Sequence, residues 1–211
     1  MSCPPSEFES ELLAFDSDPA PRHATVFYGS SSIRLWDDMA QSFPGIAVVN
    51  RGFGGSTLAD CIAVLPRVLL PLRPARLILY AADNDLDQGA SPERALGLFR
   101  QFMERIRGHF PALPIGYVSI KPSPVRFTNI ANIRRTNGLI QAAISEYPGV
   151  TYLDLFSPML SPTGAARPEL FTEDGLHMNS AGYALWSREI GAWLDAPSAS
   201  ASQPNCGFPN E

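Results

Sequence analysis

The stretch 26-VFYGSSSIRLW-36 joins an apolar segment to three consecutive serines through a single glycine. The apolar residues Ile33, Leu35 and Trp36 follow the serines within the same stretch. Serine runs are common in flexible linkers, but a linker is not bracketed this closely by aromatic and β-branched side chains. We therefore interpret the stretch as a strand, a turn and the start of a helix, and we ask whether one serine is held there for chemistry.

Short apolar runs like the one before the serines recur along the chain, separated by helix-like or loop segments. Each run is continuous rather than alternating, which is typical of strands buried on both faces of a parallel sheet. The runs are 25–28, 46–50, 77–81, 115–120 and 150–155. Strands that alternate with helices predict an α/β fold with right-handed crossovers.

Three of the intervening segments have a helical pattern. The clearest is 91–110, where Ser91 is a candidate N-cap, Pro92 suits the first turn, and apolar residues share one face. The second is expected over about 128–147, where isoleucines recur at helical spacing. The third, 180–194, closes the folded region.

Composition and charge indicate one large folded domain and argue against a nucleic-acid-binding protein. The chain has 211 residues, 45% of them hydrophobic and 18% charged, which suits one large domain that needs no disulfide or metal to fold. A net charge of −5 argues against nucleic-acid binding, because nucleic-acid-binding proteins usually carry a basic patch. The three cysteines are far apart and suggest no disulfide framework.

The two ends of the chain differ in composition from its centre. The N-terminus is acidic and lacks the apolar core of a signal peptide, so we expect a cytoplasmic protein. The most apolar region, 64–82, is interrupted by prolines and arginines and does not predict a membrane span. We expect one domain over 21–195, an N-terminal extension over 1–20, and a disordered tail rich in Ser, Ala and Pro over 196–211.

Polar segments follow several of the predicted strands. In an open parallel sheet, ligands bind beyond the carboxyl ends of the strands, so these segments are expected to converge on one edge. They are "GSSS" at 29–32, "NRGFGGST" at 50–57, "ADND" at 82–85 and "EDGLH" at 173–177.

Taken singly, each polar segment has an ordinary explanation. A serine after a strand is often only the N-cap of the next helix. The glycine cluster at 52–55 does not fit G-x-G-x-x-G, which argues against a dinucleotide site. The segment that begins "DNDLDQG" has Gln88 and Arg94 where a calcium loop needs Gly and Glu, so it does not predict a calcium site.

The three histidines can be separated by their positions. His23 precedes the first strand, at the end of the sheet opposite to the polar segments. His109 lies in the last turn of the 91–110 helix, where a cation favours the helix dipole. Only His177 lies on the side of the polar segments, and Asp174, three residues before it, is placed to orient its ring.

Together these residues supply the parts of a nucleophilic hydrolase. A hydroxyl nucleophile needs a base within hydrogen-bond reach, and the base needs an orienting acid. Attack on an ester also creates an oxyanion, which needs preorganised donors. The candidates are a serine of the "GSSS" segment, Asp174 with His177, the N–H groups of the Gly54–Gly55 turn, and the amide of Asn84.

These segments resemble the sequence blocks of the SGNH, or GDSL-type, hydrolases, and the resemblance covers about residues 24–193. "GSSSI" resembles the first block, Gly-Asp-Ser, which implies that Ser31 is the nucleophile. "DGLH" is similar to the final Asp-x-x-His block, which implies a triad of Ser31, His177 and Asp174. "NRGFGGST" and "ADND" resemble the second and third blocks, and the implied oxyanion hole is the Ser31 N–H, Gly55 and Asn84.

The resemblance is greatest to the branch that contains platelet-activating-factor-acetylhydrolase-like bacterial esterases. It implies a three-layer α/β/α, flavodoxin-like fold with a five-stranded parallel sheet in the order 2-1-3-4-5. It also implies a serine esterase that hydrolyses small or short-chain acyl esters, of acetyl-ester or lysophospholipase type, without metal or cofactor. The alternative is a non-catalytic, flavodoxin-like module that binds a small ligand, or a pseudoenzyme.

Two positions depart from the family pattern. Ser30 replaces the aspartate that usually precedes the nucleophile, and Ala82 replaces the glycine of the third block. The alanine is harmless only if its backbone has a negative φ. Separately, the segment "SIKPSPVR" at 119–126 carries Lys121 and Arg126 to the same edge of the sheet. These side chains either contact an acidic group of the substrate or are solvated charges on a proline-stiffened loop, and we favour the second interpretation.

Overall fold

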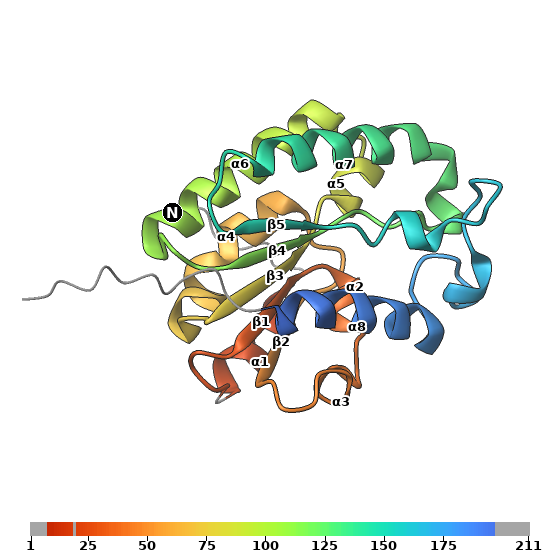
Figure 1. Cartoon of the computed structure of the whole chain (residues 1–211). Helices are drawn as coiled ribbons and strands as arrows, with labels where there is room; N and C mark the ends of the chain where they lie inside the picture. The colour runs from red at the N-terminus through yellow and green to blue at the C-terminus, as the bar shows by residue number, and fades with distance from the viewer. Residues whose placement is uncertain (1–7, 19, 197–211) are drawn as a thin grey trace, which may run out of the picture.

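The computed structural model describes residues 8–18 and 20–196, which form one five-stranded, all-parallel sheet with helices on both faces (Figure 1). The strand order is β2-β1-β3-β4-β5, which confirms the predicted order and fold class. The strands are β1 (Thr25–Gly29), β2 (Val48–Gly52), β3 (Arg76–Tyr80), β4 (Ile115–Val118) and β5 (Val150–Leu153).

Burial differs between the centre and the edges of the sheet. Every residue of β1 and β4 is buried, as expected for strands covered on both faces. The two edge strands differ from that expectation, because in β2 the burial alternates at first and in β5 only Leu153 is buried. An edge strand has one neighbour instead of two, so its side chains remain partly exposed.

The helices form two layers. One face of the sheet is covered by α4, α6 and α7, whose apolar residues join Val26, Tyr28, Leu79 and Tyr117 in the larger core. The other face is covered by α2, α3 and α8, which surround Phe27, Ile78 and Tyr80. Alternate residues of one strand point to opposite faces, so each central strand contributes to both cores.

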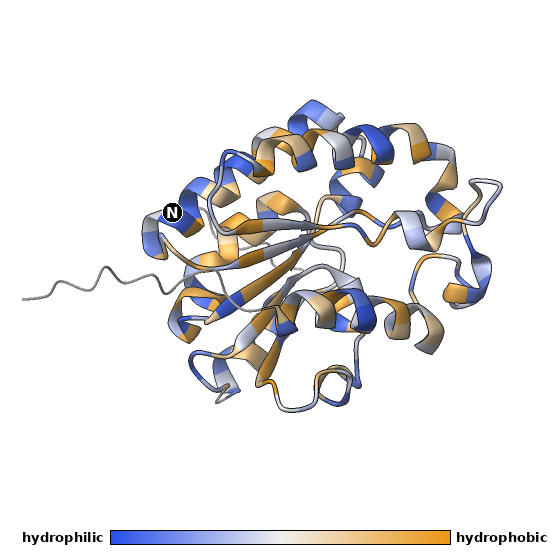
Figure 2. Ribbon diagram, in the orientation of Figure 1, coloured by the Kyte–Doolittle hydropathy of each residue, from blue (hydrophilic) through white to orange (hydrophobic). Residues whose placement is uncertain are grey.

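The bounds of α6 and α8, each of which has a side-chain N-cap, agree with the sequence signals. The helices are α1 (Glu9–Ser17), α2 (Ser31–Arg34), α3 (Met39–Ser42), α4 (Leu58–Val68), α5 (Asp83–Asp87), α6 (Pro92–His109), α7 (Ile130–Ile144) and α8 (Ser180–Asp195), and the 3-10 turns are η2 (Leu70–Leu72), η3 (Pro124–Asn129), η4 (Ser157–Met159) and η5 (Pro168–Leu170). Ser91 caps α6 by accepting a hydrogen bond from the N–H of Arg94 at 3.2 Å. The helix expected from residue 128 begins as the 3-10 turn η3 and becomes α-helical only at Ile130. The helices carry both hydrophobic and hydrophilic stretches along their ribbons (Figure 2).

The N-terminal helix α1 packs on the rest of the protein. Phe8 and Leu12 are buried in the larger core, and the ring of Phe8 lies edge-on to Phe53 at 5.1 Å. The buried side chain of Arg51 pairs with Asp18 at 2.8 Å. Residues 8–18 are therefore joined to the sheet by both apolar and charged contacts.

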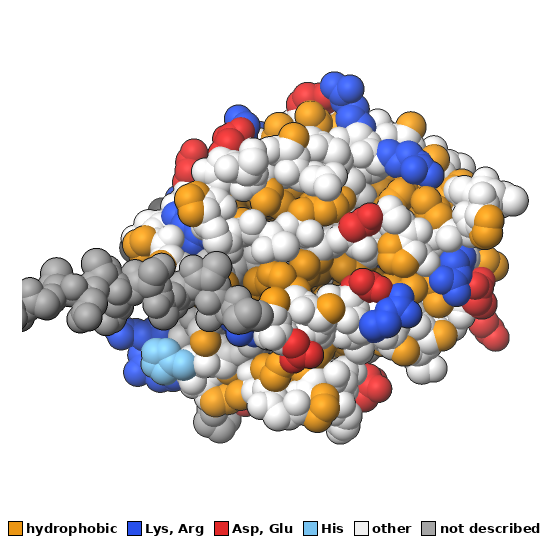
Figure 3. Space-filling view, in the orientation of Figure 1, with side chains coloured by type: hydrophobic (Ala, Val, Ile, Leu, Met, Phe, Trp, Pro, Cys, Tyr) orange, Lys and Arg blue, Asp and Glu red, His pale blue; other side chains and the backbone are white. Residues whose placement is uncertain are grey.

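The face of the protein drawn in Figure 3 carries charges of both signs. Lys and Arg side chains are interspersed with Asp and Glu side chains on the face drawn in Figure 3. Within residues 8–18 and 20–196, no helix is both long and apolar enough to cross a membrane. The predicted tail falls almost wholly on residues 197–211, which lie outside the described residues.

Candidate active site

The turn after β1 places Ser31 at the first position of helix α2. Gly29 precedes it with φ +138°, and a Cβ at Gly29 would lie 1.8 Å from the carbonyl oxygen of Tyr80 in the neighbouring strand. Only glycine fits such a close approach. The backbone N–H of Ser30 donates a hydrogen bond to the same Tyr80 carbonyl at 3.2 Å. The Ser30 carbonyl in turn accepts hydrogen bonds from the N–H groups of Ile33 and Arg34 in helix α2.

Asp174 and His177 lie in a turn between η5 and α8. The turn is closed by the Thr172 N–H, which donates to the His177 carbonyl at 2.8 Å. His177 Nδ1 lies 2.6 Å from Asp174 Oδ2, and His177 Nε2 lies 3.1 Å from Ser31 Oγ. Ser31 and His177 are 146 positions apart in the chain, so the fold brings together residues that are remote in sequence.

The surroundings of Asp174 keep its carboxylate ionised. Desolvation raises the pKa of Asp174, but hydrogen bonds from the backbone N–H groups of Leu176 and His177 and from the Thr172 hydroxyl hold it well below its usual value. These bonds measure 2.8, 2.9 and 2.7 Å to Asp174 Oδ1. An ionised carboxylate only accepts, so Nδ1 of His177 carries the hydrogen and Nε2 is free to accept from Ser31.

The second polar segment spans the end of β2 and the loop between β2 and α4. Gly55 adopts φ +75°, and no residue in the described part of the chain accepts a hydrogen bond from its N–H. The neighbouring Gly54 N–H donates to the Glu11 carboxylate at 3.2 Å. Glu11 also pairs with Nε of Arg34 at 3.2 Å, so the N-terminal helix is joined to both the glycine loop and helix α2.

Sequence reasoning missed this contribution of Glu11, which lies in the segment that it treated as an extension. The signal that would have found the helix is the spacing of Phe8, Leu12 and Phe15, which places three large apolar side chains on one face. The position of Glu11 against Gly54 follows only from the packing of that helix.

The third polar segment begins helix α5 and holds Asn84. The side chain of Asn84 is buried, with Nδ2 donating to the Ser56 carbonyl at 2.9 Å. Its Oδ1 accepts from Nη2 of Arg126 at 3.0 Å. The next residue, Asp85, accepts from the N–H of Leu58 at 2.9 Å and so joins α5 to the start of α4.

Ala82 does not meet the condition set by the sequence. It has φ +87°, in the left-handed region, where the family pattern has a glycine. The left-handed conformation costs an L-residue roughly 1–2 kcal/mol, because Cβ crowds the following carbonyl oxygen. The backbone strain lies two residues before Asn84, so the departure at Ala82 is not neutral.

The interpretation of Lys121 and Arg126 as solvated charges is wrong. Lys121 is only 1% exposed, and its Nζ lies 3.1 Å from Asp83 Oδ2 and 3.2 Å from the Tyr80 hydroxyl. Arg126 reaches the other oxygen of Asp83 at 2.9 Å. Desolvation lowers the pKa of Lys121 while the Asp83 carboxylate opposes the shift. For Asp83, desolvation is outweighed by the two cations, which keep its pKa below its usual value.

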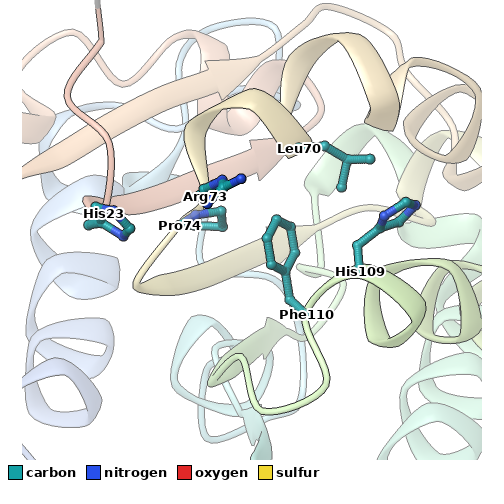
Figure 4. Close-up of a pocket in the computed structure, with 6 residues that line it drawn as sticks. All are labelled: His23, Leu70, Arg73, Pro74, His109 and Phe110. Atoms are coloured by element: carbon teal, nitrogen blue, oxygen red, sulfur yellow. The ribbon is translucent and has the colours of Figure 1, made fainter.

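The other two histidines lie away from this site. His23 and His109 line one surface pocket with Arg73 and Phe110, and Figure 4 shows the two rings at opposite sides of that pocket. His23 precedes β1 and Ser31 follows it, so the pocket is at the other end of the sheet, as expected. Among the described residues, no group of three or more His, Cys, Asp and Glu side chains could hold a metal ion.

The fold and the site together define a flavodoxin-like α/β protein with a serine, a histidine and an aspartate in hydrogen-bond contact. The sequence model of the GDSL-like Lipase/Acylhydrolase family matches residues 22–185, which is most of the chain. The chain therefore belongs to this family and is a carboxylic ester hydrolase. The comparison with curated proteins finds no match.

Solved structures show the same fold. A Streptococcus pneumoniae protein provisionally described as a platelet activating factor is similar with a TM-score of 0.79 at 20% identity, covering 89% of this chain and 91% of the other. A GDSL-like lipase from Bacteroides thetaiotaomicron is similar with a TM-score of 0.73 at 18% identity, and the match covers 89% of this chain and 96% of the other. A carbohydrate esterase of family 3 from Talaromyces cellulolyticus is similar with a TM-score of 0.62 at 16% identity, and the match covers 81% of this chain and 96% of the other.

Proposed function

We propose that the protein hydrolyses small or short-chain acyl esters through a triad of Ser31, His177 and Asp174. The observation that carries the proposal is the pair of contacts on the His177 ring, 3.1 Å to Ser31 Oγ and 2.6 Å to Asp174 Oδ2. A base in contact with both a hydroxyl and an orienting carboxylate is the arrangement that activates a serine.

In the first half of the reaction, Ser31 Oγ forms a bond to the carbonyl carbon of the ester, and His177 Nε2 takes the hydroxyl proton. The tetrahedral intermediate then collapses, the bond to the alcohol breaks, and His177 returns the proton to the departing oxygen. In the second half, water attacks the acyl-serine with His177 again as base, and the acid leaves as Ser31 regains its proton.

The oxyanion of each tetrahedral intermediate needs hydrogen-bond donors already in place. We assign this role to the backbone N–H groups of Ser31 and Gly55 and to the Asn84 side-chain amide. Two features support the assignment: Ser31 begins a helix, where the N–H groups have no partner within the helix, and one of the two Nδ2 hydrogens of Asn84 is not used by Ser56.

The short-chain preference rests on the openness of the site. The side chain of His177 is 27% exposed and that of Asp174 is 47% exposed, so the triad lies at an open edge of the sheet. An open edge gives a long acyl chain little apolar surface to bury, and burial is what would stabilise its binding. We expect kcat/KM to fall as the acyl chain of a p-nitrophenyl ester is lengthened beyond a few carbons. A maximum at long chains would contradict the preference but not the triad.

The test of the triad is the turnover of p-nitrophenyl acetate by Ser31→Ala. We expect turnover to be lost while the melting temperature stays near that of the wild type. The matched control is Ser32→Ala, in the next position, where the buried hydroxyl has no hydrogen-bond partner among the described residues. Wild-type turnover in Ser31→Ala would refute the proposal. A ligand-dependent melting shift without turnover in the wild type would favour the binding-module alternative.

A further inference from the structure

The side chain of Arg126 lies beside the proposed oxyanion hole and has no part in the steps above. It comes from the 3-10 turn η3, and its side chain is 13% exposed. Nη1 contacts Asp83 Oδ1 at 2.9 Å, and Nη2 donates to Asp87 Oδ2 at 2.9 Å and to Asn84 Oδ1 at 3.0 Å. The guanidinium is therefore held by two carboxylates while it touches the Asn84 amide.

The contacts of Asn84 fix which end of its amide faces which neighbour. An arginine only donates and a backbone carbonyl only accepts, so Oδ1 must face Arg126 and Nδ2 must face Ser56. The second Nδ2 hydrogen is then left for the oxyanion. Without the guanidinium, Asn84 Oδ1 loses this donor, and the orientation of the amide is held only by its hydrogen bond to Ser56.

Arg126 is not needed simply to neutralise the buried Asp83. Lys121 already pairs with that carboxylate at 3.1 Å, and the two side chains are 2% and 4% exposed. The second carboxylate that contacts Arg126, Asp87, is 52% exposed. The second cation is therefore balanced by Asp87 from the solvent side, and the donor that faces Asn84 Oδ1 is a charged guanidinium. A hydrogen bond from a charged donor is roughly twice as strong as one between neutral groups.

The segment around Arg126 also touches the triad turn. The N–H of Val125 donates to the Gly175 carbonyl at 3.1 Å, and Gly175 lies between Asp174 and His177 in the chain. The η3 turn therefore contacts both the turn that carries Asp174 and His177 and, through Arg126, the proposed oxyanion-hole residue Asn84.

We propose, on the basis of the proposed function, that Arg126 is a positioning residue of the oxyanion hole. Its guanidinium holds the Asn84 amide oxygen so that an amide N–H faces the oxyanion as it forms. The hydrogen bond from the Asn84 amide to the oxyanion is stronger in the transition state than in the ground state. Loss of the arginine that positions this amide therefore lowers kcat and leaves KM nearly unchanged.

The first experiment compares kcat and KM for p-nitrophenyl acetate in Arg126→Met, which keeps the aliphatic bulk and removes the donors. We expect kcat to fall about tenfold, the order of one hydrogen bond to a charged group, with KM within about twofold. Arg126→Lys keeps the charge and should recover part of the loss. Arg135→Met is the matched control, because it removes an exposed arginine paired with Glu93, and it should leave kcat unchanged.

The decisive experiment introduces Arg126→Met into the Asn84→Ala background. If Arg126 acts through Asn84, the second substitution lowers kcat no further. A further tenfold loss, or wild-type kcat in Arg126→Met alone, would overturn the inference. If Arg126→Met does not fold, as judged by circular dichroism, Arg126→Lys is used in the same cycle: the loss of kcat that it causes alone should vanish in the Asn84→Ala background, and a loss that persists there would overturn the inference. Unchanged kcat in Asn84→Ala would instead refute the oxyanion-hole assignment itself.

Discussion

Removing the charge of Lys121 should destabilise the protein far more than removing a charge from its surface. The ammonium is almost fully buried against Asp83, and breaking a buried ion pair by deleting one partner costs about 3–5 kcal/mol, because the other charge is left behind. Arg126 still contacts Asp83 at 2.9 Å after this substitution. For Lys121→Met we therefore expect a loss of folding stability at the lower end of this range, about 3 kcal/mol.

The assay is urea unfolding followed by circular dichroism, with the slope m required to stay constant. For a domain of this size, about 3 kcal/mol corresponds to a fall of about 6–12 °C in the melting temperature. The control is Arg135→Met, where both partners of the pair are more than half exposed, and it should cost less than about 1 kcal/mol. A cost for Lys121→Met no larger than that of the control would refute this reasoning.

Three further predictions concern single positions. Asn84→Ala should lower kcat by about 10²–10³, or roughly 2.7–4 kcal/mol, by analogy with loss of one oxyanion donor, and steady-state kinetics with an unchanged kcat would remove Asn84 from the hole. Asp174→Asn should lower kcat by about 10⁴, by analogy with other triads. The folded-state pKa of Asp174 is depressed, so its contribution to stability is present above about pH 4 and is lost on further acidification. Melting temperatures from pH 7 to pH 3 should therefore fall more steeply in the wild type than in Asp174→Asn, and parallel curves would contradict this. Ala82→Gly should raise stability by no more than about 1 kcal/mol, since relief of strain is partly offset by the greater entropy of the unfolded glycine chain, and a clear loss of stability in chemical denaturation would show that Ala82 is not strained.

The fold could be predicted from the sequence because its strands are marked by continuous apolar runs. Both faces of β1, β3 and β4 are covered, so their sequences carry a strong signal. The apolar run 46–50 predicts the edge strand β2 two residues too early, because the strand spans Val48–Gly52. Helix α4 was missed because Pro66, a helix breaker, lies inside it. Five buried residues, including Leu65 and Val68, stabilise the helix despite that proline.

The position of the candidate site could be predicted because strand topology alone brings the polar loops to one edge. The burial of Lys121 could not be predicted from the sequence, because its partner Asp83 lies 38 positions earlier in the chain. A lysine in a proline-rich loop has the same local sequence whether it is solvated or paired. The alanine itself gives no sign of the left-handed backbone at position 82, and only the glycine that the family pattern has there points to it.

The central claim is that His177 activates the Ser31 hydroxyl, and covalent labelling tests it most directly. The protein is treated with a fluorophosphonate, and the modified peptide is identified by mass spectrometry in the wild type and in His177→Ala. We predict one phosphonate adduct on Ser31 in the wild type, and labelling that is slower by orders of magnitude in His177→Ala. Labelling of a different residue, or an equal rate in the two proteins, would contradict the account.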